Sequence, residues 1–125
     1  EGTHALWLAR DRLGKKPLYI AQTPGRLYFA SELKGILALD EIVCDVDLEA
    51  LDLYLVFQHV PAPRTIWQGV TKLQAGHSLI SHSGRISVAP YWEPAGGGES
   101  VGDMEDWGER VFNELFESVK VRMEA

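Results

Sequence analysis

Three features are scarce in this chain of 125 residues: cysteine, excess positive charge and long apolar runs. Cys44 is the only cysteine, so an internal disulfide is excluded and a reducing cytoplasm is the expected location. The net charge of -6 provides no electrostatic footprint for nucleic acid or an anionic membrane surface. The longest apolar stretches are interrupted by Arg10, Lys34, Asp52 and Gln58, so none reaches transmembrane length.

The composition is that of a globular protein, with 46% hydrophobic and 24% charged residues. This length suits one small domain with a single core. The N-terminus lacks the basic and then apolar pattern of a signal peptide. Because residue 1 is Glu rather than Met, we expect the chain to be part of a longer protein. The balance of charge indicates small-molecule chemistry or protein contacts.

The first third of the sequence predicts a small sheet. Apolar residues favour strands at 5–10, 17–22 and 27–30. Turn-forming residues at 11–16 and 23–26 separate these strands. We therefore predict an antiparallel meander of three strands.

Two helices are predicted next. Ser31 is expected to cap a short helix at 32–39, and Asp47 a second helix at 48–57. Pro61 and Pro63 cannot continue that second helix, because proline lacks the backbone donor. The residues expected in the core of this region are Phe29, Leu33, Ile36 and Leu37.

The last third predicts a hairpin, a linker and a long helix. Residues 77–82 and 85–90 are expected to pair around a turn at Ser83 and Gly84. The Gly-rich stretch 93–102 is typical of a flexible linker. Beyond it, Asp103 is expected to cap a helix whose apolar stripe is Met104, Trp107, Val111, Leu115, Val119 and Met123.

Patterns for nucleotide or metal binding are not met in this sequence. Gly14-Lys15 lacks the residues that a phosphate-binding loop requires at Ala9 and Lys16. A triple glycine at 96–98 follows no strand and suits a linker. The candidates for a metal site are His77, His82 and Cys44, but the two histidines point to opposite faces of one strand. We predict no metal-binding and no cofactor-binding residues.

Patterns for covalent or acid-base catalysis are also weak. Ser78 and Ser81 lie near histidines without the turn that exposes a catalytic serine. For Cys44 we favour inert packing, and a reactive thiolate near the start of helix 48–57 is the alternative. Arg10 and Asp11 are interpreted as a turn anchor, with a catalytic role as the alternative. Carboxylate pairs at 40–41 and at 45 and 47 are explained by capping and solvation, so no catalytic residue is predicted.

Four segments in chain order carry a resemblance to a known family. They are LARDRLGKKPLY at 8–19, GRLYFASELK at 25–34, VPAPRTIWQGVTKL at 60–73, and GHSL at 76–79 followed by Gly84 and Tyr91-Trp92. Together they resemble the glutamine-hydrolysing asparagine synthetases, which are class II amidotransferases with an N-terminal nucleophile. Gln74-Ala75 stands where that family usually has proline before Gly76.

The resemblance implies an α+β fold. Residues 1–92 would be the C-terminal half of the type-2 glutamine amidotransferase domain, an antiparallel-sheet portion of an N-terminal-nucleophile sandwich, with its connecting segment. Residues 93–102 would be the linker. Residues 103–125 would be the first helix of an α/β synthetase domain of the ATP-pyrophosphatase type.

The resemblance also implies a function for the parent enzyme, namely ATP-dependent amidation of aspartate with ammonia from glutamine. Its substrates would be glutamine, aspartate and ATP, with Mg²⁺ as the metal. The family's catalytic cysteine and its Ser-Gly-Gly-x-Asp-Ser loop match no residues here, so we transfer no catalytic residue and expect this segment alone to be inactive and to bind no cofactor.

Three questions stay open at this stage. The parent could instead be a related amidoligase, β-lactam-forming or peptide-cyclising, that uses the same two domains on another carboxylate. The chain could also be a non-catalytic interaction domain. A homo-oligomer formed through an exposed sheet edge is a further expectation, since unpaired strand edges invite pairing with another chain.

Overall fold

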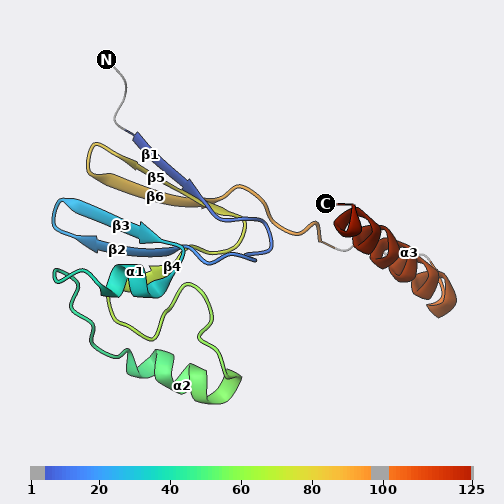
Figure 1. Ribbon diagram of the computed structural model, residues 1–125, viewed down its shortest axis with the longest axis horizontal. Helices are drawn as coiled ribbons and strands as arrows, with labels where there is room; N and C mark the ends of the chain where they lie inside the picture. Colours follow the sequence, from blue (N-terminus) through green and yellow to red (C-terminus); the bar gives the residue numbers. More distant parts are fainter. Residues whose placement is uncertain (1–4, 97–101, 125) are drawn as a thin grey trace. The chain divides into compact units, whose positions relative to one another are not determined.

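The computed structural model describes residues 5–96 and 102–124, and the chain divides into two compact units, Glu1–Glu93 and Pro94–Ala125. Part of the expected linker, residues 97–101, lies outside the described residues, as does Ala125 at the end of the expected last helix. Among the described residues, the first unit contains all the strands and two helices, and the second contains one helix (Figure 1).

The first unit holds two three-stranded antiparallel sheets that face each other (Figure 1). The first sheet has the order β1-β5-β6, formed by Ala5–Ala9, His77–His82 and Arg85–Pro90. The second sheet has the order β3-β2-β4, formed by Arg26–Ala30, Tyr19–Thr23 and Val70–Lys72. The observed mixture of antiparallel sheets and helices agrees with the predicted α+β class.

The predicted meander of the first three strands is wrong. β1 pairs with β5, with Leu8 opposite Leu79, and does not pair with β2. The connection at 10–18 is longer than a hairpin loop, so it is free to carry the chain from one sheet to the other. The β2–β3 hairpin is confirmed, because Thr23 pairs with Arg26 across a two-residue turn.

The short strand β4 was not predicted from the sequence. Its three residues pair with β2, with Ala21 opposite Val70. Three residues carry too short a pattern for alternation to be recognised. This strand matters for the site, since it completes the second sheet and leads directly into Leu73.

The core lies in two layers, one on each face of the second sheet. Ile20, Leu73 and Leu79 are buried between the two sheets. The next residue along β2, Ala21, points to the opposite face and is buried with Ile36 and Val70. Successive side chains of a strand point to opposite faces, so β2 contributes to both layers.

Helix α1 (Leu33–Leu37) covers the outer face of the second sheet (Figure 1). Two expectations about this region are wrong. The residue at the N-cap is Glu32 rather than Ser31, and no side chain accepts a capping hydrogen bond there. Phe29 is not a core residue, because 48% of it is exposed, whereas Ile36 is buried as expected.

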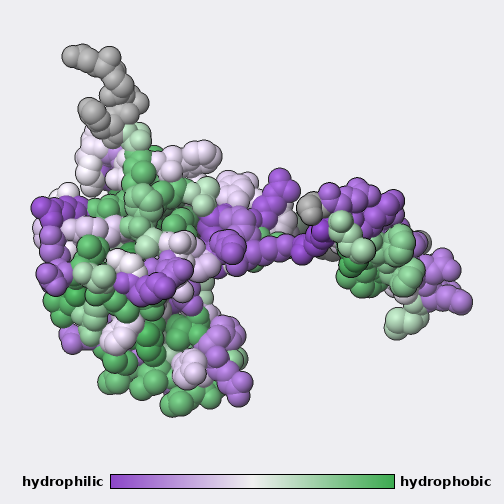
Figure 2. All heavy atoms as spheres, viewed as in Figure 1, coloured by the Kyte–Doolittle hydropathy of each residue, from purple (hydrophilic) through white to green (hydrophobic). Residues whose placement is uncertain are grey.

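Helix α2 (Leu48–Phe57) is capped as predicted by Asp47, whose carboxylate accepts from the backbone nitrogens of Glu49 and Ala50. Much of the helix is apolar and exposed, and its region of the first unit is a hydrophobic surface in Figure 2. The exposed apolar residues of α2 are Leu48, Leu51, Tyr54, Leu55, Val56 and Phe57.

The hairpin of β5 and β6 is confirmed, with His82 opposite Arg85. Ser83 and Gly84 both have positive φ, at 50° and 75°. Positive φ at both central residues is the geometry of a type I′ turn, which matches the twist of the two strands.

The second unit consists mainly of helix α3 (Met104–Met123). Asp103 caps it as predicted, accepting from the backbone nitrogens of Glu105 and Asp106. The Asp106 carboxylate accepts in turn from the Asp103 backbone nitrogen, which completes a capping box. The apolar stripe is exposed within the described residues (Figure 2).

Candidate functional site: a cavity between the sheets and the turn at its end

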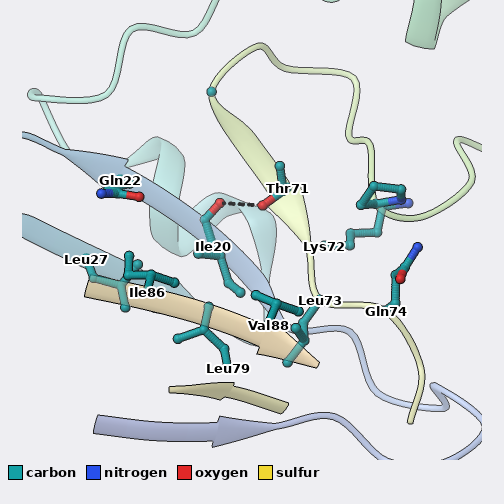
Figure 3. A pocket seen from close by; sticks show the side chains of 12 residues that line it. Ile20, Gln22, Leu27, Thr71, Lys72, Leu73, Gln74, Leu79, Ile86 and Val88 are labelled. Carbon is teal, nitrogen blue, oxygen red and sulfur yellow. Dashed lines mark hydrogen bonds between the residues drawn. The ribbon is translucent and has the colours of Figure 1, made fainter. Parts of the chain in front are cut away.

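A cavity of about 400 Å³ lies between the two sheets. Aliphatic side chains from both sheets converge on it, including Ile20, Leu79 and Val88 (Figure 3). Polar groups are present as well: Gln22, Thr71, Lys72 and Gln74 lie along its lining. A concave, mostly apolar site with a few polar groups is the usual form of a small-molecule pocket.

Lys72 is the charged residue of this lining. Its ammonium donates to the backbone carbonyl of Val60. Burial, and then the positive charge of Arg10, lower the pKa of the Lys72 ammonium. Lys72 also lines a second cavity of about 430 Å³ near α2, so this residue borders both hollows. The sequence offered no signal for this role, because a lysine in a short strand usually faces water.

A turn at 10–16 closes one end of the two sheets. The carboxylate of Asp11 accepts from the backbone nitrogens of Lys15 and Lys16, at 2.9 and 3.1 Å. These hydrogen bonds lower the pKa of the Asp11 carboxyl, since they stabilise its charged form. The carbonyl of Asp11 accepts from Gly14 and from Gly76, both at 3.0 Å, which ties the turn to the start of β5.

Arg10 binds three backbone carbonyls through its three guanidinium nitrogens. Nε donates to Lys16 at 2.9 Å, Nη1 to Leu73 at 2.7 Å and Nη2 to Gly14 at 2.8 Å. The backbone carbonyl of Arg10 accepts from the hydroxyl of Tyr91 at 2.7 Å. The turn-anchor interpretation of Arg10 and Asp11 is confirmed by these contacts. Both oxygens of Asp11 and all three nitrogens of Arg10 are engaged with the backbone, which does not favour the catalytic alternative.

The residues considered for a metal site do not come together. His77 and His82 lie on opposite faces of β5, as the strand period requires. The thiol of Cys44 donates to the carbonyl of Ile42 at 3.5 Å, which fits a packing role. Among residues 5–96 and 102–124, no three His, Cys, Asp or Glu side chains are arranged to hold a metal ion. Ser78 and Ser81 lie in β5, in regular strand pairing.

The acidic residues near the helix ends have structural partners. A hydrogen bond from Tyr28, followed by contacts with Arg26, lowers the pKa of the Glu41 carboxyl. The pKa of the Asp47 carboxyl is lowered first by the Ala50 backbone donor and also by Arg64. Capping therefore accounts for Asp47, as the sequence indicated, whereas the contacts of Glu41 with Tyr28 and Arg26 were not expected from the sequence.

The sequence did not predict the ion pairs and hydrogen bonds formed by Arg64 and Thr65, in the segment that precedes β4. Arg64 forms ion pairs with both Asp47 and Glu49 at the start of α2. Thr65 is buried, and its hydroxyl donates to the carbonyl of Val70 at 2.8 Å. No local pattern reveals these links, because the partners are brought together by the fold.

The described helices offer no candidate for a membrane span, because none combines the required length with sufficient hydropathy.

Comparison with known proteins identifies the family. Residues 1–92 match a family described as the glutamine amidotransferase domain. Over 122 residues the chain is 33% identical to a protein of Methanocaldococcus jannaschii provisionally named asparagine synthetase (glutamine-hydrolyzing) 2, covering 94% of this chain and 24% of that protein. Over 91 residues it is 37% identical to asparagine synthetase (glutamine-hydrolyzing) 1 of Bacillus subtilis, covering 72% of this chain and 14% of that protein.

A third relative carries a different name. The chain is 32% identical over 123 residues to the amidase chyE of Penicillium rubens, covering 94% of this chain and 17% of that protein. The chain thus spans a quarter or less of the length of these three relatives. The family match covers both sheets, the anchored turn and the cavity between them. This chain belongs to the glutamine amidotransferase domain family, and its relatives include glutamine-hydrolysing asparagine synthetases.

Proposed function

We propose that this chain is part of a glutamine-dependent amidoligase of the asparagine synthetase type. The observation that carries the proposal is the family match over residues 1–92 together with relatives named for glutamine hydrolysis. In the whole enzyme, glutamine is hydrolysed to release ammonia, and ammonia then amidates aspartate at the expense of ATP. The enzyme acts in the cytoplasm on these small molecules.

The two units have different parts in this proposal. Residues 1–92 form the C-terminal half of the glutaminase sandwich and its connecting segment, and residues 93–102 form a linker. Helix α3 is the first helix of the synthetase domain. Its exposed apolar residues, among them Trp107 and Leu115, support this assignment, because such a stripe requires an apolar partner surface.

The residues described here do not fit ATP or Mg²⁺. The Gly14-Lys15 segment lacks the phosphate-loop pattern. Its backbone is already bonded, because the Gly14 carbonyl accepts from the Arg10 guanidinium and the Lys15 nitrogen donates to the Asp11 carboxylate. Within the described ranges there is also no cluster of acidic or histidine ligands. ATP and Mg²⁺ are therefore proposed for the whole enzyme, and this chain contributes scaffold to the glutamine-handling half.

The test uses the full-length protein that carries this segment. Incubation with aspartate, ATP and Mg²⁺ should yield asparagine with either glutamine or ammonium as nitrogen donor, and glutamine should be converted to glutamate. The segment 1–125 alone should release no ammonia from glutamine. Absence of asparagine with both donors would overturn the proposed acceptor.

A second candidate keeps the glutamine chemistry and changes the acceptor. The amidase of Penicillium rubens has nearly the same identity to the chain as the Methanocaldococcus protein, 32% against 33%. A related amidoligase acting on another carboxylate, as in β-lactam formation or peptide cyclisation, is therefore the alternative. Glutaminase activity without asparagine formation would favour it, whereas a full-length protein with neither activity would indicate an interaction domain.

A further inference from the structure

We propose that Arg10 is a positioning residue for the glutamine-dependent reaction, because its guanidinium ties one sheet to the other at the end of the cavity between them. The predicted effect of Arg10 on activity rests on the proposed function. The tie itself rests on the contacts of Arg10 alone and can be tested separately. Arg10 is not a catalytic residue in this proposal, since its three nitrogens are occupied by backbone carbonyls.

The contact with Leu73 is the one that links the two sheets. Arg10 directly follows β1, which belongs to the first sheet. Leu73 directly follows β4 of the second sheet, and its backbone nitrogen donates to the carbonyl of Leu18 at 2.9 Å. The bond from Arg10 Nη1 to the Leu73 carbonyl therefore connects segments 63 residues apart that belong to opposite sheets.

This link lies at the wall of the cavity. The side chain of Leu73 is buried between the sheets and lines the hollow with Gln74 (Figure 3). Apolar contacts across the hollow, such as those of Ile20 and Leu79, are non-directional and tolerate a range of separations. A hydrogen bond from a charged donor is directional, so it fixes the separation at this end.

The surroundings of Arg10 are shaped for the guanidinium. A Cβ on Gly14 would lie 2.9 Å from Arg10 Nη2 and 3.1 Å from the Cβ of Ala75, so glycine leaves the space that the guanidinium requires. Tyr91 holds the backbone of Arg10 from the other side. Lysine would keep the charge, but a single ammonium cannot reproduce the planar fork that reaches three separate carbonyls.

Arg12 provides a matched control in the same turn. Its guanidinium lies over the ring of Trp92, 5.9 Å from the ring centroid, and it is exposed. Replacing Arg12 changes the same charge two positions away without touching Leu73. The variants are therefore Arg10→Met and Arg10→Lys, compared with Arg12→Met and Arg12→Lys, all in the full-length protein.

The kinetic measurement separates the two nitrogen sources. Arg10→Met should reduce kcat/KM for glutamine by about tenfold or more, because small displacements of a site wall are costly to a reaction. Amide formation from ammonium should stay within about twofold of wild type, since it bypasses the glutamine half. Arg10→Lys should be intermediate, and both Arg12 variants should match wild type. Equal loss of both activities in Arg10→Met and Arg10→Lys, or no loss in either, would overturn the positioning role.

Hydrogen exchange tests the tie without any assay of activity. In Arg10→Met, the backbone amides of Leu73 and Gly76 should exchange faster than in the Arg12 variants. If Arg10→Met does not fold, the same measurement is made on Arg10→Lys. Amides of the β5–β6 turn region, such as Arg85, should be unchanged. Equal exchange at Leu73 and Gly76 in all variants would overturn the tie. If wild type consumes neither glutamine nor ammonium, the proposed function fails, and this measurement still decides the role of Arg10.

Discussion

The carbonyl of Gly76 accepts hydrogen bonds from the backbone nitrogens of both Tyr91 and Trp92, and Gly76 fits there because it has no side chain. Its φ is +68°, and a Cβ at this position would overlap the carbonyl oxygen of Trp92. This close approach brings the segment after β6 back to the start of β5. It also places Tyr91 where its hydroxyl reaches the Arg10 carbonyl.

Gly76→Ala should therefore be strongly destabilising. Gly25 is a useful comparison, since its φ is +80° but, apart from its chain neighbours, none of the described residues lies within 4 Å of a Cβ there. Gly25→Ala should cost about 1 kcal/mol for the left-handed conformation alone. Gly76→Ala should cost roughly 3 kcal/mol, because backbone overlap is added to the same conformational cost. Urea unfolding of both variants measures the difference, and equal effects would show that the Trp92 contact is unimportant.

Asp11 should make stability depend on pH in the acidic range. Hydrogen bonds from Lys15 and Lys16 lower the pKa of its carboxyl in the folded protein. A group with a lowered folded pKa stabilises the fold above its unfolded pKa, and this contribution disappears as the pH falls through the folded value. Asp11→Asn should thus be less stable than wild type at pH 7, with a difference that shrinks below about pH 4. Denaturant midpoints measured at pH 7 and at pH 3 test this; a difference that is constant with pH would contradict it.

Alanine substitutions of Leu79 and Ile80 should differ sharply in their cost to stability, although the two residues are adjacent in β5. Leu79 is 2% exposed and faces the second sheet, whereas Ile80 is 44% exposed. Leu79→Ala should cost about 2–5 kcal/mol, since it removes buried methyl groups and leaves a cavity. Ile80→Ala should cost about 1 kcal/mol or less. Thermal unfolding of the two variants compares them, and similar losses would mean that Ile80 is covered in the protein tested.

Helix α3 should respond in opposite directions to two alanine substitutions. In a peptide spanning residues 102–124, Asp103→Ala removes the capping box and should destabilise the helix by about 1 kcal/mol. Gly108→Ala should stabilise it by about 1 kcal/mol, because a Cβ at this position would meet no other described side chain within 4 Å. Circular dichroism at 222 nm reports helix content for both peptides. A loss of helicity with Gly108→Ala would contradict the prediction.

Local features were predicted well from the residues themselves. Asp47 and Asp103 cap their helices, and Ser83-Gly84 forms the hairpin turn. In each case the side chain or backbone preference acts within a few residues, so the sequence contains the whole interaction. Ser31 is not a cap, because the helix begins one residue later than expected and Glu32 takes the N-cap position.

The candidate site was only partly predictable. Asp11 was recognised as a turn anchor, since the backbone nitrogens that donate to its carboxylate lie in the next few residues. The partner of Arg10 at Leu73 and the two cavities beside Lys72 had no local signal. They depend on β4, which is too short to be recognised and is held in place by β2.

The sequence by itself therefore determined the turns at 23–26 and 83–84, the caps of α2 and α3, the hairpin at 77–90 and the resemblance to the amidotransferase family. Only the tertiary structure decided that β1 pairs with β5 and that Arg10 spans the two sheets. The physical reason is that the alternation of a strand defines its two faces and leaves its partner open. The partner is chosen when distant segments bury their apolar faces together, and that choice is made by the whole chain.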